Sequence, residues 1–303
     1  MNRKEVINNK PRLSLILVTM NRKEVLKTCL RSVQKQAFPD VEIIVVDNAS
    51  SDGTGDMVRR LFPEVRYYYL SANLGPPGGR NYGVRMSTAE ICVFIDDDAV
   101  FLDGDALKRV VSYFRSDRGL GCLAFRVLKP DGCEEYKSIP RVDKKILQED
   151  YECSYFCGAG FACRRSLLLE AGMFWEPLFY NAEELDLSYR LVNNGYKILR
   201  SSAISVLHYE TPQARVPGKW IYYGVRSRCW VALRNLPWPH VTSNTLFWWG
   251  YYFIAAIRNR HLIYFMQGVK DAIIGLPKVM RTRSCISKET IARLKVLSGR
   301  VYY

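Results

Sequence analysis

The first hundred residues alternate short apolar runs with amphipathic stretches. Between the first two runs, Leu26, Leu30 and Val33 recur at helical spacing and define one apolar face. Such alternation is typical of β-α units that build a mostly parallel sheet, so the pattern predicts the α/β class. The predicted strands are 13–18, 42–47, 65–70 and 91–95.

Turn residues punctuate this region. Ser50, Ser51, Asp52 and Gly53 predict a turn that opens a helix over 54–62. The GPPGG run at 75–79 predicts a tight loop that leads into a short helix over 80–86.

The regular alternation fades after Asp98, and a second lobe is expected there. The pattern divides the chain into three parts, which are residues 11–100, 101–210 and 211–303. Within the second part we expect a helix at 105–114, a strand at 120–128, a polar loop at 129–152, a buried strand at 154–163 and a helix at 183–194 that ends at Asn194-Gly195.

Charge separates the last part from the rest. The chain has 303 residues and a formal charge of +14, yet residues 1–210 hold 29 basic against 28 acidic side chains. Residues 211–303 hold 15 Lys and Arg against only Asp271 and Glu289. The composition, with 48% hydrophobic and 24% charged residues, is that of a globular protein and excludes a disordered or collagen-like chain.

The basic tail is also aromatic. Its most apolar stretch, 245–257, is shorter than the roughly 20 residues that cross a bilayer, and Arg258 and Arg260 follow it. We therefore expect residues 211–303 to lie on an anionic membrane surface. An ordinary core helix with solubilising charges is the alternative. Nucleic-acid binding is not expected, because no recognised motif accompanies the charge.

The nine cysteines form no CxxC pair, and Met1 to Arg12 is polar rather than apolar, so no signal peptide is expected. Buried, unreactive thiols in a reducing cytoplasm fit this usage best. We expect a cytoplasmic protein that is peripheral on the inner face of the cell membrane.

Three consecutive carboxylates, Asp96, Asp97 and Asp98, follow the apolar strand at 91–95. Adjacent carboxylates repel one another, and a divalent cation relieves the repulsion. Alternation along an extended chain sends Asp96 and Asp98 to one side and Asp97 to the other. Hard oxygen ligands suit Mg²⁺ or Mn²⁺ bound to phosphates. A solvated acidic turn is the alternative interpretation.

Polar residues also follow the other predicted strands, at the sheet edge where α/β proteins bind ligands. Asp47 is suited to accept from a base imide or a ribose hydroxyl, and the fork of Arg80 is suited to hold a phosphate. Taken together, these residues predict a nucleotide cradle. The residues at these strand ends are Thr19, Asn21, Asp47, Asn73, Arg80, Asp96 and Asp97.

The order of these motifs resembles glycosyltransferase family 2, and in particular bacterial rhamnosyltransferase-like enzymes. The resemblance covers residues 11–210 and implies the GT-A fold, with 11–100 as the nucleotide-sugar-binding half and 101–210 as the acceptor half. It implies that Asp47 reads the nucleobase, Asp96 lies near the ribose and Asp98 binds the metal. The motifs are Thr19-x-Asn21-Arg22, Val45-Val46-Asp47-Asn48-x-Ser50-x-Asp52-Gly53-Thr54, Asn73-x-Gly75, Gly79-Arg80-Asn81-x-Gly83 and Asp96-Asp97-Asp98.

The second lobe extends the resemblance through Glu183-Glu184-Leu185-Asp186 and Gly158-Ala159-Gly160. It implies that Glu184 is the general base, with Glu183 as a competing candidate and Asp186 as a third. His208 stands where many family members carry a metal-binding histidine. On the residues alone, these acids complement a helix dipole, and Asp186 pairs with Arg190 at i, i+4.

These observations predict an inverting glycosyltransferase dependent on Mg²⁺ or Mn²⁺. Its donor is a nucleoside-diphosphate sugar, and its acceptor is a glycan or a polyprenyl-linked glycan in surface polysaccharide synthesis. A sugar-phosphate nucleotidyltransferase is the alternative enzyme, but the first strand lacks the glycine-rich loop that it needs. A non-catalytic membrane or nucleic-acid binding protein leaves the acidic triplet and Glu184 unexplained.

Overall fold

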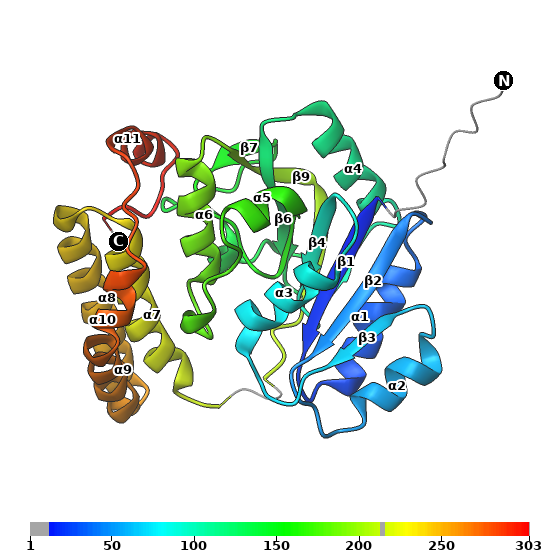
Figure 1. Ribbon diagram of the computed structural model, residues 1–303, viewed down its shortest axis with the longest axis horizontal. Helices are drawn as coiled ribbons and strands as arrows, with labels where there is room; N and C mark the ends of the chain where they lie inside the picture. The colour runs from blue at the N-terminus through cyan, green and yellow to red at the C-terminus, as the bar shows by residue number, and fades with distance from the viewer. Residues whose placement is uncertain (1–11, 213–215, 303) are drawn as a thin grey trace.

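The computed structural model describes residues 12–212 and 216–302. One mixed sheet runs through the lobe formed by residues 12–212, in the order β3-β2-β1-β4-β8-β6-β9-β5, and β7 pairs with β9 (Figure 1). The first four strands are parallel, and β8 enters antiparallel between β4 and β6. The strands are β1 (Leu13–Thr19), β2 (Val41–Asp47), β3 (Arg66–Tyr69), β4 (Ile91–Ile95), β5 (Ala99–Phe101), β6 (Leu120–Leu128), β7 (Tyr151–Cys153), β8 (Gly160–Arg164) and β9 (Lys197–His208).

Side chains alternate across the sheet and build a core on each face. Leu15 and Leu17 belong to the core under α1, α2 and α4, whereas Ile16 belongs to the core under α3, α5 and α6. The sheet is therefore covered on both sides, as parallel strands require. The helices are α1 (Lys23–Gln34), α2 (Thr54–Leu61), α3 (Gly75–Met86), α4 (Ala106–Ser116), α5 (Arg165–Glu170) and α6 (Glu183–Asn193).

The predicted α/β class is confirmed, and most predicted elements lie within two residues of the observed bounds. The loop predicted at 75–79 is wrong, because α3 already begins at Gly75. Its two prolines lie in the first turn, where an N–H has no acceptor within the helix. Gly75 has φ +71°, and a Cβ there would lie 2.1 Å from the Phe179 carbonyl oxygen.

Two expectations in the second lobe also need correction. Only the end of the strand predicted at 154–163 is extended, as β8, because residues 154–159 form a loop that passes the strand ends. The polar stretch at 129–152 packs against the lobe, with a helical turn at Tyr136–Ser138, the strand β7 near its end, and Glu135 buried.

The last part of the chain is helical and lies beside α6 (Figure 1). α7 packs against α6, α8 and α9, so it is the innermost helix of the layer. No helix in the described ranges is long and apolar enough to cross a membrane. The helices are α7 (Lys219–Asn235), α8 (Trp238–Arg258), α9 (Leu262–Ile274), α10 (Leu276–Arg281) and α11 (Lys288–Val296).

A buried acid fastens this helical layer to the catalytic lobe. Asp186 of α6 is fully buried and accepts hydrogen bonds from Arg190 on its own helix and from Arg234 and Asn235 on α7. Burial acts to raise the pKa of Asp186, but the two guanidinium groups outweigh it and hold the pKa below its usual range.

We predict that Asp186→Ala lowers the free energy of unfolding by about 3–5 kcal/mol, because it leaves Arg190 and Arg234 without their buried counter-charge. Urea denaturation measures the loss. Asp56→Ala, which breaks an exposed ion pair with Arg59 on α2, is the control and should cost under about 1 kcal/mol. Equal losses in the two variants would contradict a fastening role for Asp186.

Candidate active site

The acidic triplet lies at the carboxyl edge of the sheet. β1, β2 and β4 are parallel, so Thr19, Asp47 and the triplet emerge at the same edge. β5 follows the triplet and pairs with the end of β9, where Ala99 stands opposite His208. This register brings His208 next to Asp98, although 110 positions of sequence separate them.

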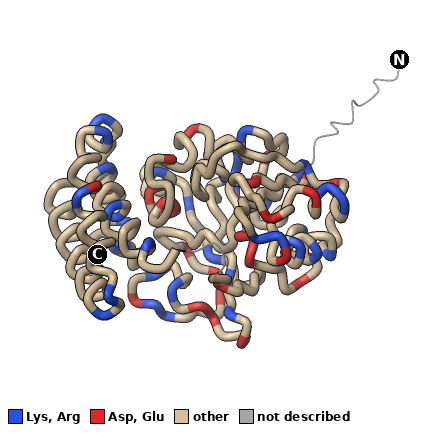
Figure 2. The backbone as a smooth tube through the Cα atoms, turned by 90° about the horizontal axis from the view of Figure 1, so that it is seen from below, with Lys and Arg blue, Asp and Glu red and all other residues tan. Residues whose placement is uncertain are grey.

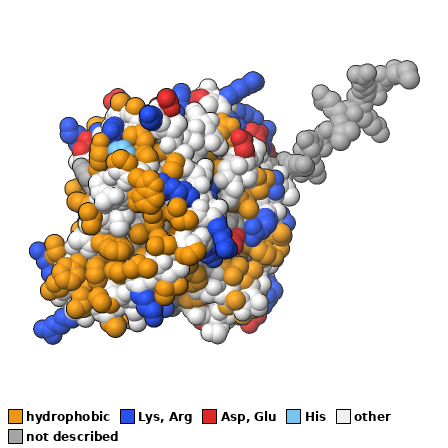
Figure 3. Space-filling model, turned by 60° about the vertical axis from the view of Figure 1, so that its left-hand side comes forward, with side chains coloured by type: hydrophobic (Ala, Val, Ile, Leu, Met, Phe, Trp, Pro, Cys, Tyr) orange, Lys and Arg blue, Asp and Glu red, His pale blue; other side chains and the backbone are white. Residues whose placement is uncertain are grey.

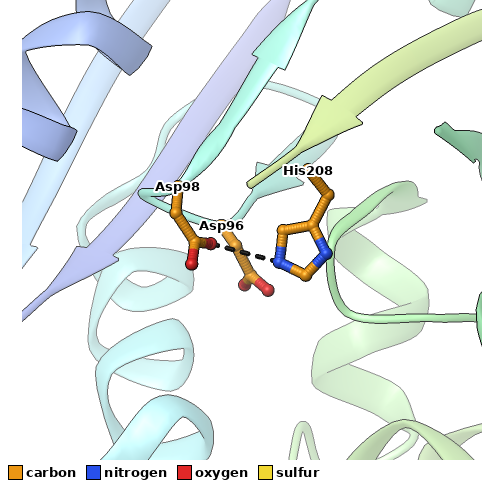
Figure 4. A group of neighbouring side chains, drawn as sticks. All are labelled: Asp96, Asp98 and His208. Atoms are coloured by element: carbon orange, nitrogen blue, oxygen red, sulfur yellow. Dashed lines mark ion pairs between the residues drawn. The ribbon is translucent and has the colours of Figure 1, made fainter. Parts of the chain in front are cut away.

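Asp96, Asp98 and His208 point toward one another (Figure 4). Their ligand atoms all lie within 4.8 Å of one another, and His208 Nε2 is 3.2 Å from Asp98 Oδ1. Burial raises the pKa of Asp96. The Arg80 guanidinium opposes this shift, and the Asp98 carboxylate adds to it. A part-exposed carboxylate, a buried carboxylate and an imidazole nitrogen form a donor set that fits a divalent cation.

Glu135 lies behind the histidine. Its Oε2 is 3.4 Å from His208 Nδ1 and also accepts from the Ser138 hydroxyl. Burial lowers the pKa of His208, but the carboxylates of Asp98 and Glu135 outweigh it and raise the pKa to about 10. A carboxylate on the second ring nitrogen orients a metal-binding histidine. Sequence reasoning missed Glu135, because it lies in a stretch without periodicity.

Arg80 of α3 is buried and binds carboxylates from two elements. Its Nη2 is 3.1 Å from Asp96 Oδ1, and its Nη1 is 2.8 Å from Glu184 Oε1 and 3.5 Å from Glu183 Oε1. A Cβ on Gly158 would lie 2.1 Å from Glu184 Oε1, so only glycine leaves room there. The structure thus gives Arg80 carboxylate partners instead of the expected phosphate.

The two glutamates at the start of α6 differ in exposure. The Glu183 side chain is 5% exposed, and burial together with Glu184 raises its pKa to about 8. The Glu184 side chain is 17% exposed, and among the described residues its Oε2 accepts no hydrogen bond. Asp186 lies on the α7 side of the same helix with both oxygens engaged, so the geometry gives no support to Asp186 as a base.

Asp97 turns away from the cluster, as the alternation predicts. It accepts from the Thr19 hydroxyl at 2.7 Å and from Arg22 Nη1 at 2.7 Å, and burial raises its pKa to about 6. Thr19 and Asp97 therefore bind each other in this structure, and the nucleotide contact expected of them stays a prediction. Arg22 also reaches Asp98, at 3.3 Å, and was not singled out among the candidate site residues.

The remaining cradle residues surround the end of β2. Asp47 is buried and accepts from the backbone N–H of Ser50 and from the Tyr67 hydroxyl. Asn21 accepts from the backbone N–H of Ser51, and Asn73 accepts from that of Gly75. A hollow of about 490 Å³ adjoins this corner. It is lined by Ser50, Ser51, Gly53, Thr54, Gly55, Asp56, Arg59, Tyr67 and Tyr69.

Comparison with known families agrees with this arrangement. The model of the family described as glycosyl transferase family 2 matches residues 14–172, and the chain belongs to that family. The fold is GT-A. A mannosyltransferase from Pyrobaculum calidifontis, solved with GDP-Man and Mn²⁺, is similar with a TM-score of 0.56 and 20% identity, covering 95% of this chain and 79% of that one.

Two curated relatives are bacterial transferases. The chain is 32% identical over 184 residues to the GalNAc(5)-diNAcBac-PP-undecaprenol beta-1,3-glucosyltransferase of Campylobacter jejuni, and the match covers 58% of each protein. It is 24% identical over 209 residues to the O-antigen chain rhamnosyltransferase RfbN of Salmonella typhimurium, over 65% of this chain and 66% of that one. The resemblance to rhamnosyltransferases is thereby confirmed.

We predict that Asp98→Asn abolishes Mn²⁺ binding measured by calorimetry, and that Glu135→Gln weakens it about 10- to 100-fold, because the orienting carboxylate of His208 is lost. Asp103→Asn, which removes an exposed carboxylate that pairs with Arg109, is the control and should bind as the wild type does. Unchanged affinity in Glu135→Gln would contradict the orienting role.

Proposed function

We propose that this family 2 glycosyltransferase is a metal-dependent, inverting enzyme that moves a sugar from a nucleoside-diphosphate sugar to a hydroxyl group of a lipid-linked glycan. The observation that carries the proposal is the position of Glu184, which Arg80 holds beside the group formed by Asp96, Asp98 and His208. The proton acceptor Glu184 and the cation-binding group thus lie on either side of the Arg80 guanidinium.

The donor belongs at the carboxyl edge of the first four strands. The hollow at the end of β2 offers Tyr67 and Tyr69 to a nucleobase, and the Tyr67 hydroxyl donates to Asp47 behind it. Asp96, Asp98 and His208 would hold Mg²⁺ or Mn²⁺. Such a cation neutralises charge that develops on the departing diphosphate.

Glu184 is the proposed base. Arg80 fixes its Oε1, which leaves Oε2 to take the proton from the acceptor hydroxyl as that oxygen attacks the anomeric carbon. A single displacement inverts the anomeric configuration and forms no covalent enzyme intermediate. Glu183 is the poorer candidate, because a carboxyl group whose pKa is about 8 is mostly protonated at neutral pH.

The acceptor side faces the helical layer. α8 and α9 expose a broad apolar face. The side chains of this face are 44–65% exposed. Hydrophobic side chains gather over this face with Lys and Arg at its margins (Figure 3), and the few charged positions of these helices are mostly basic (Figure 2). The face consists of Leu246, Phe247, Tyr251, Phe253, Ile254, Ile257, Leu262, Ile263, Met266, Ile273 and Ile274.

An apolar face of this extent with basic margins suits the interface of an anionic bilayer. We propose that it places the enzyme on the cytoplasmic face of the cell membrane, where a polyprenyl-linked acceptor resides. The Campylobacter relative is named for such an undecaprenol-linked acceptor. Nucleic acid is not among the proposed partners.

We predict that the wild type is stabilised by one of UDP, dTDP, GDP or CMP with Mn²⁺ and not with EDTA, and that Glu184→Gln keeps this stabilisation. A nucleotide concentration of about 100 times the dissociation constant adds roughly 2.7 kcal/mol to the free energy of unfolding, which a thermal shift detects. Transfer from the matching nucleotide sugar should fall about 10²- to 10⁴-fold in Glu184→Gln, because the proton acceptor is lost.

Glu64→Gln is the control for this experiment, because Glu64 is an exposed glutamate that accepts from Gln34 and precedes β3, at the amino edge of the sheet opposite the site. It should transfer at the wild-type rate. Full transfer by Glu184→Gln would move the base to Glu183. No nucleotide response in the wild type would contradict the proposed donor.

We predict that Ile254→Asp combined with Ile257→Asp weakens binding to anionic vesicles at least tenfold in a flotation assay. The two isoleucines contribute about 1.5–3 kcal/mol each when fully buried in an apolar phase. Val296→Asp on α11, at a position 84% exposed, is the control and should bind as the wild type does. Undiminished vesicle binding by the double variant would show that α8 does not enter the membrane.

A further inference from the structure

Two arginines share one aromatic ring where the helical layer meets the catalytic lobe. The guanidinium carbon of Arg228, on α7, lies 3.6 Å from the centroid of Trp248 on α8. The guanidinium carbon of Arg300, which follows α11, lies 5.4 Å from the same ring and 4.8 Å from that of Tyr155. Like charges placed this close repel one another unless an anion lies between them.

The structure gives these two side chains no acid. Arg234 and Arg293, from the same basic tail, pair with Asp186 and Glu152, but no ion pair in the described ranges includes Arg228 or Arg300. The Nε and Nη1 atoms of Arg228 are buried without a hydrogen-bond partner. Burial and the proximity of Arg300 lower the pKa of Arg228. An unpaired buried guanidinium is costly, which marks a place where a ligand can supply the missing charge.

A third cation joins them from the polar stretch after β6. Lys144 Nζ donates to the carbonyls of Ile139 and Lys137, at 2.7 and 3.1 Å, and to the Tyr155 hydroxyl at 3.4 Å. Burial, Arg300 and Arg228 lower the pKa of Lys144 to about 8, against a weaker opposing effect of Glu135. Three cations therefore converge from three separate segments of the chain.

The cluster is connected to the active site on one side and to the apolar face on the other. Tyr155 stands three residues before Gly158, which touches Glu184 and Arg80. In the other direction, the Trp248 ring contacts Phe247 and Tyr251 of the apolar face, with ring centroids 5.4 Å apart in both cases. An anion bound here would lie between the proposed base and the proposed membrane surface.

The geometry points to a binding site, formed by Arg228 and Arg300 with the positive charge of Lys144 beside them, for the phosphate or diphosphate group of a lipid-linked acceptor. This inference rests on the proposed function, which supplies the lipid-linked acceptor. Arginine forks bind phosphate oxygens in pairs, and the neighbouring aromatic side chains suit the first carbons of a lipid chain. The head groups of bilayer lipids also carry phosphate. The experiment below therefore distinguishes binding of the acceptor from binding of bilayer lipids.

The test is calorimetric titration of the full chain with a soluble short-chain isoprenyl diphosphate, in EDTA and without nucleotide. Arg300→Gln should weaken binding at least tenfold, and Arg228→Gln should do the same. Arg300→Gln is the safer variant, because it keeps the Arg300 carbonyl, which accepts from Tyr189. Arg118→Gln, which removes an exposed arginine of the catalytic lobe, should bind as the wild type does.

Each arm has an outcome that counts against the site. The isoprenyl alcohol should bind much more weakly than the diphosphate, and equal binding would overturn the phosphate assignment. Undiminished diphosphate affinity in both variants would overturn the site. A loss confined to anionic vesicles in Arg300→Gln would assign the cluster to bilayer head groups instead of the acceptor.

Nucleotide binding separates this proposal from the proposed function. Arg300→Gln should keep the wild-type thermal shift with the nucleoside diphosphate and Mn²⁺, because it leaves the donor side intact. If the wild type fails to respond to any nucleotide, the proposed function is overturned, whereas the loss of diphosphate affinity in Arg300→Gln still reports on the arginine cluster.

Discussion

The geometry of the active site depends on the buried guanidinium of Arg80. It joins Asp96, which follows β4, to Glu183 and Glu184, which open α6, so a single side chain connects the end of β4 to the start of α6. The aromatic rings of Phe161 and Phe174 lie 5.6 Å from it and hold it in place. Without this charge, three carboxylates would repel one another in a poorly solvated site. Arg80 therefore sets the separation between the proposed base and the cation-binding group.

The local pattern of apolar and polar residues was sufficient to predict the fold and part of the candidate site. Alternating apolar runs defined the strands from 13 to 128, and the period of an extended chain placed Asp96 and Asp98 on one side with Asp97 on the other. The partners of Arg80 could not be predicted, because its fork suits a phosphate and a carboxylate equally well. Glu135 gave no signal at all, since it meets His208 across 73 positions in a stretch without periodicity.

Asp186 shows the same limit at the other side of α6. The sequence indicated its pair with Arg190, which lies one turn away, but Arg234 and Asn235 come from a helix 48 and 49 positions later. The consequence is functional as well as structural, because α6 carries Glu184 on one side and this network on the other. The helical layer is thus attached to the same helix that carries the proposed base.

The basic residues of 211–303 add up to one net charge in the sequence, but in the structure they occupy three different environments. Arg234 and Arg293 pair with acids of the catalytic lobe, and Arg258 and Arg260 are exposed where α8 ends. Arg228 and Arg300 do neither, because they turn inward beside Trp248.

An amphiphilic, lipid-linked acceptor consists of a hydrocarbon chain, a phosphate group and a sugar hydroxyl, in that order. An enzyme that uses it must bind all three parts in the same order. The apolar face adjoins the inward arginines through Trp248, and the chain from Tyr155 to Gly158 leads from these arginines to Glu184. Because Asp186 fixes the layer to α6, the depth at which the apolar face enters a bilayer would also fix how far the acceptor hydroxyl stands from Glu184. Docking on the membrane and alignment for catalysis would then depend on one rigid connection.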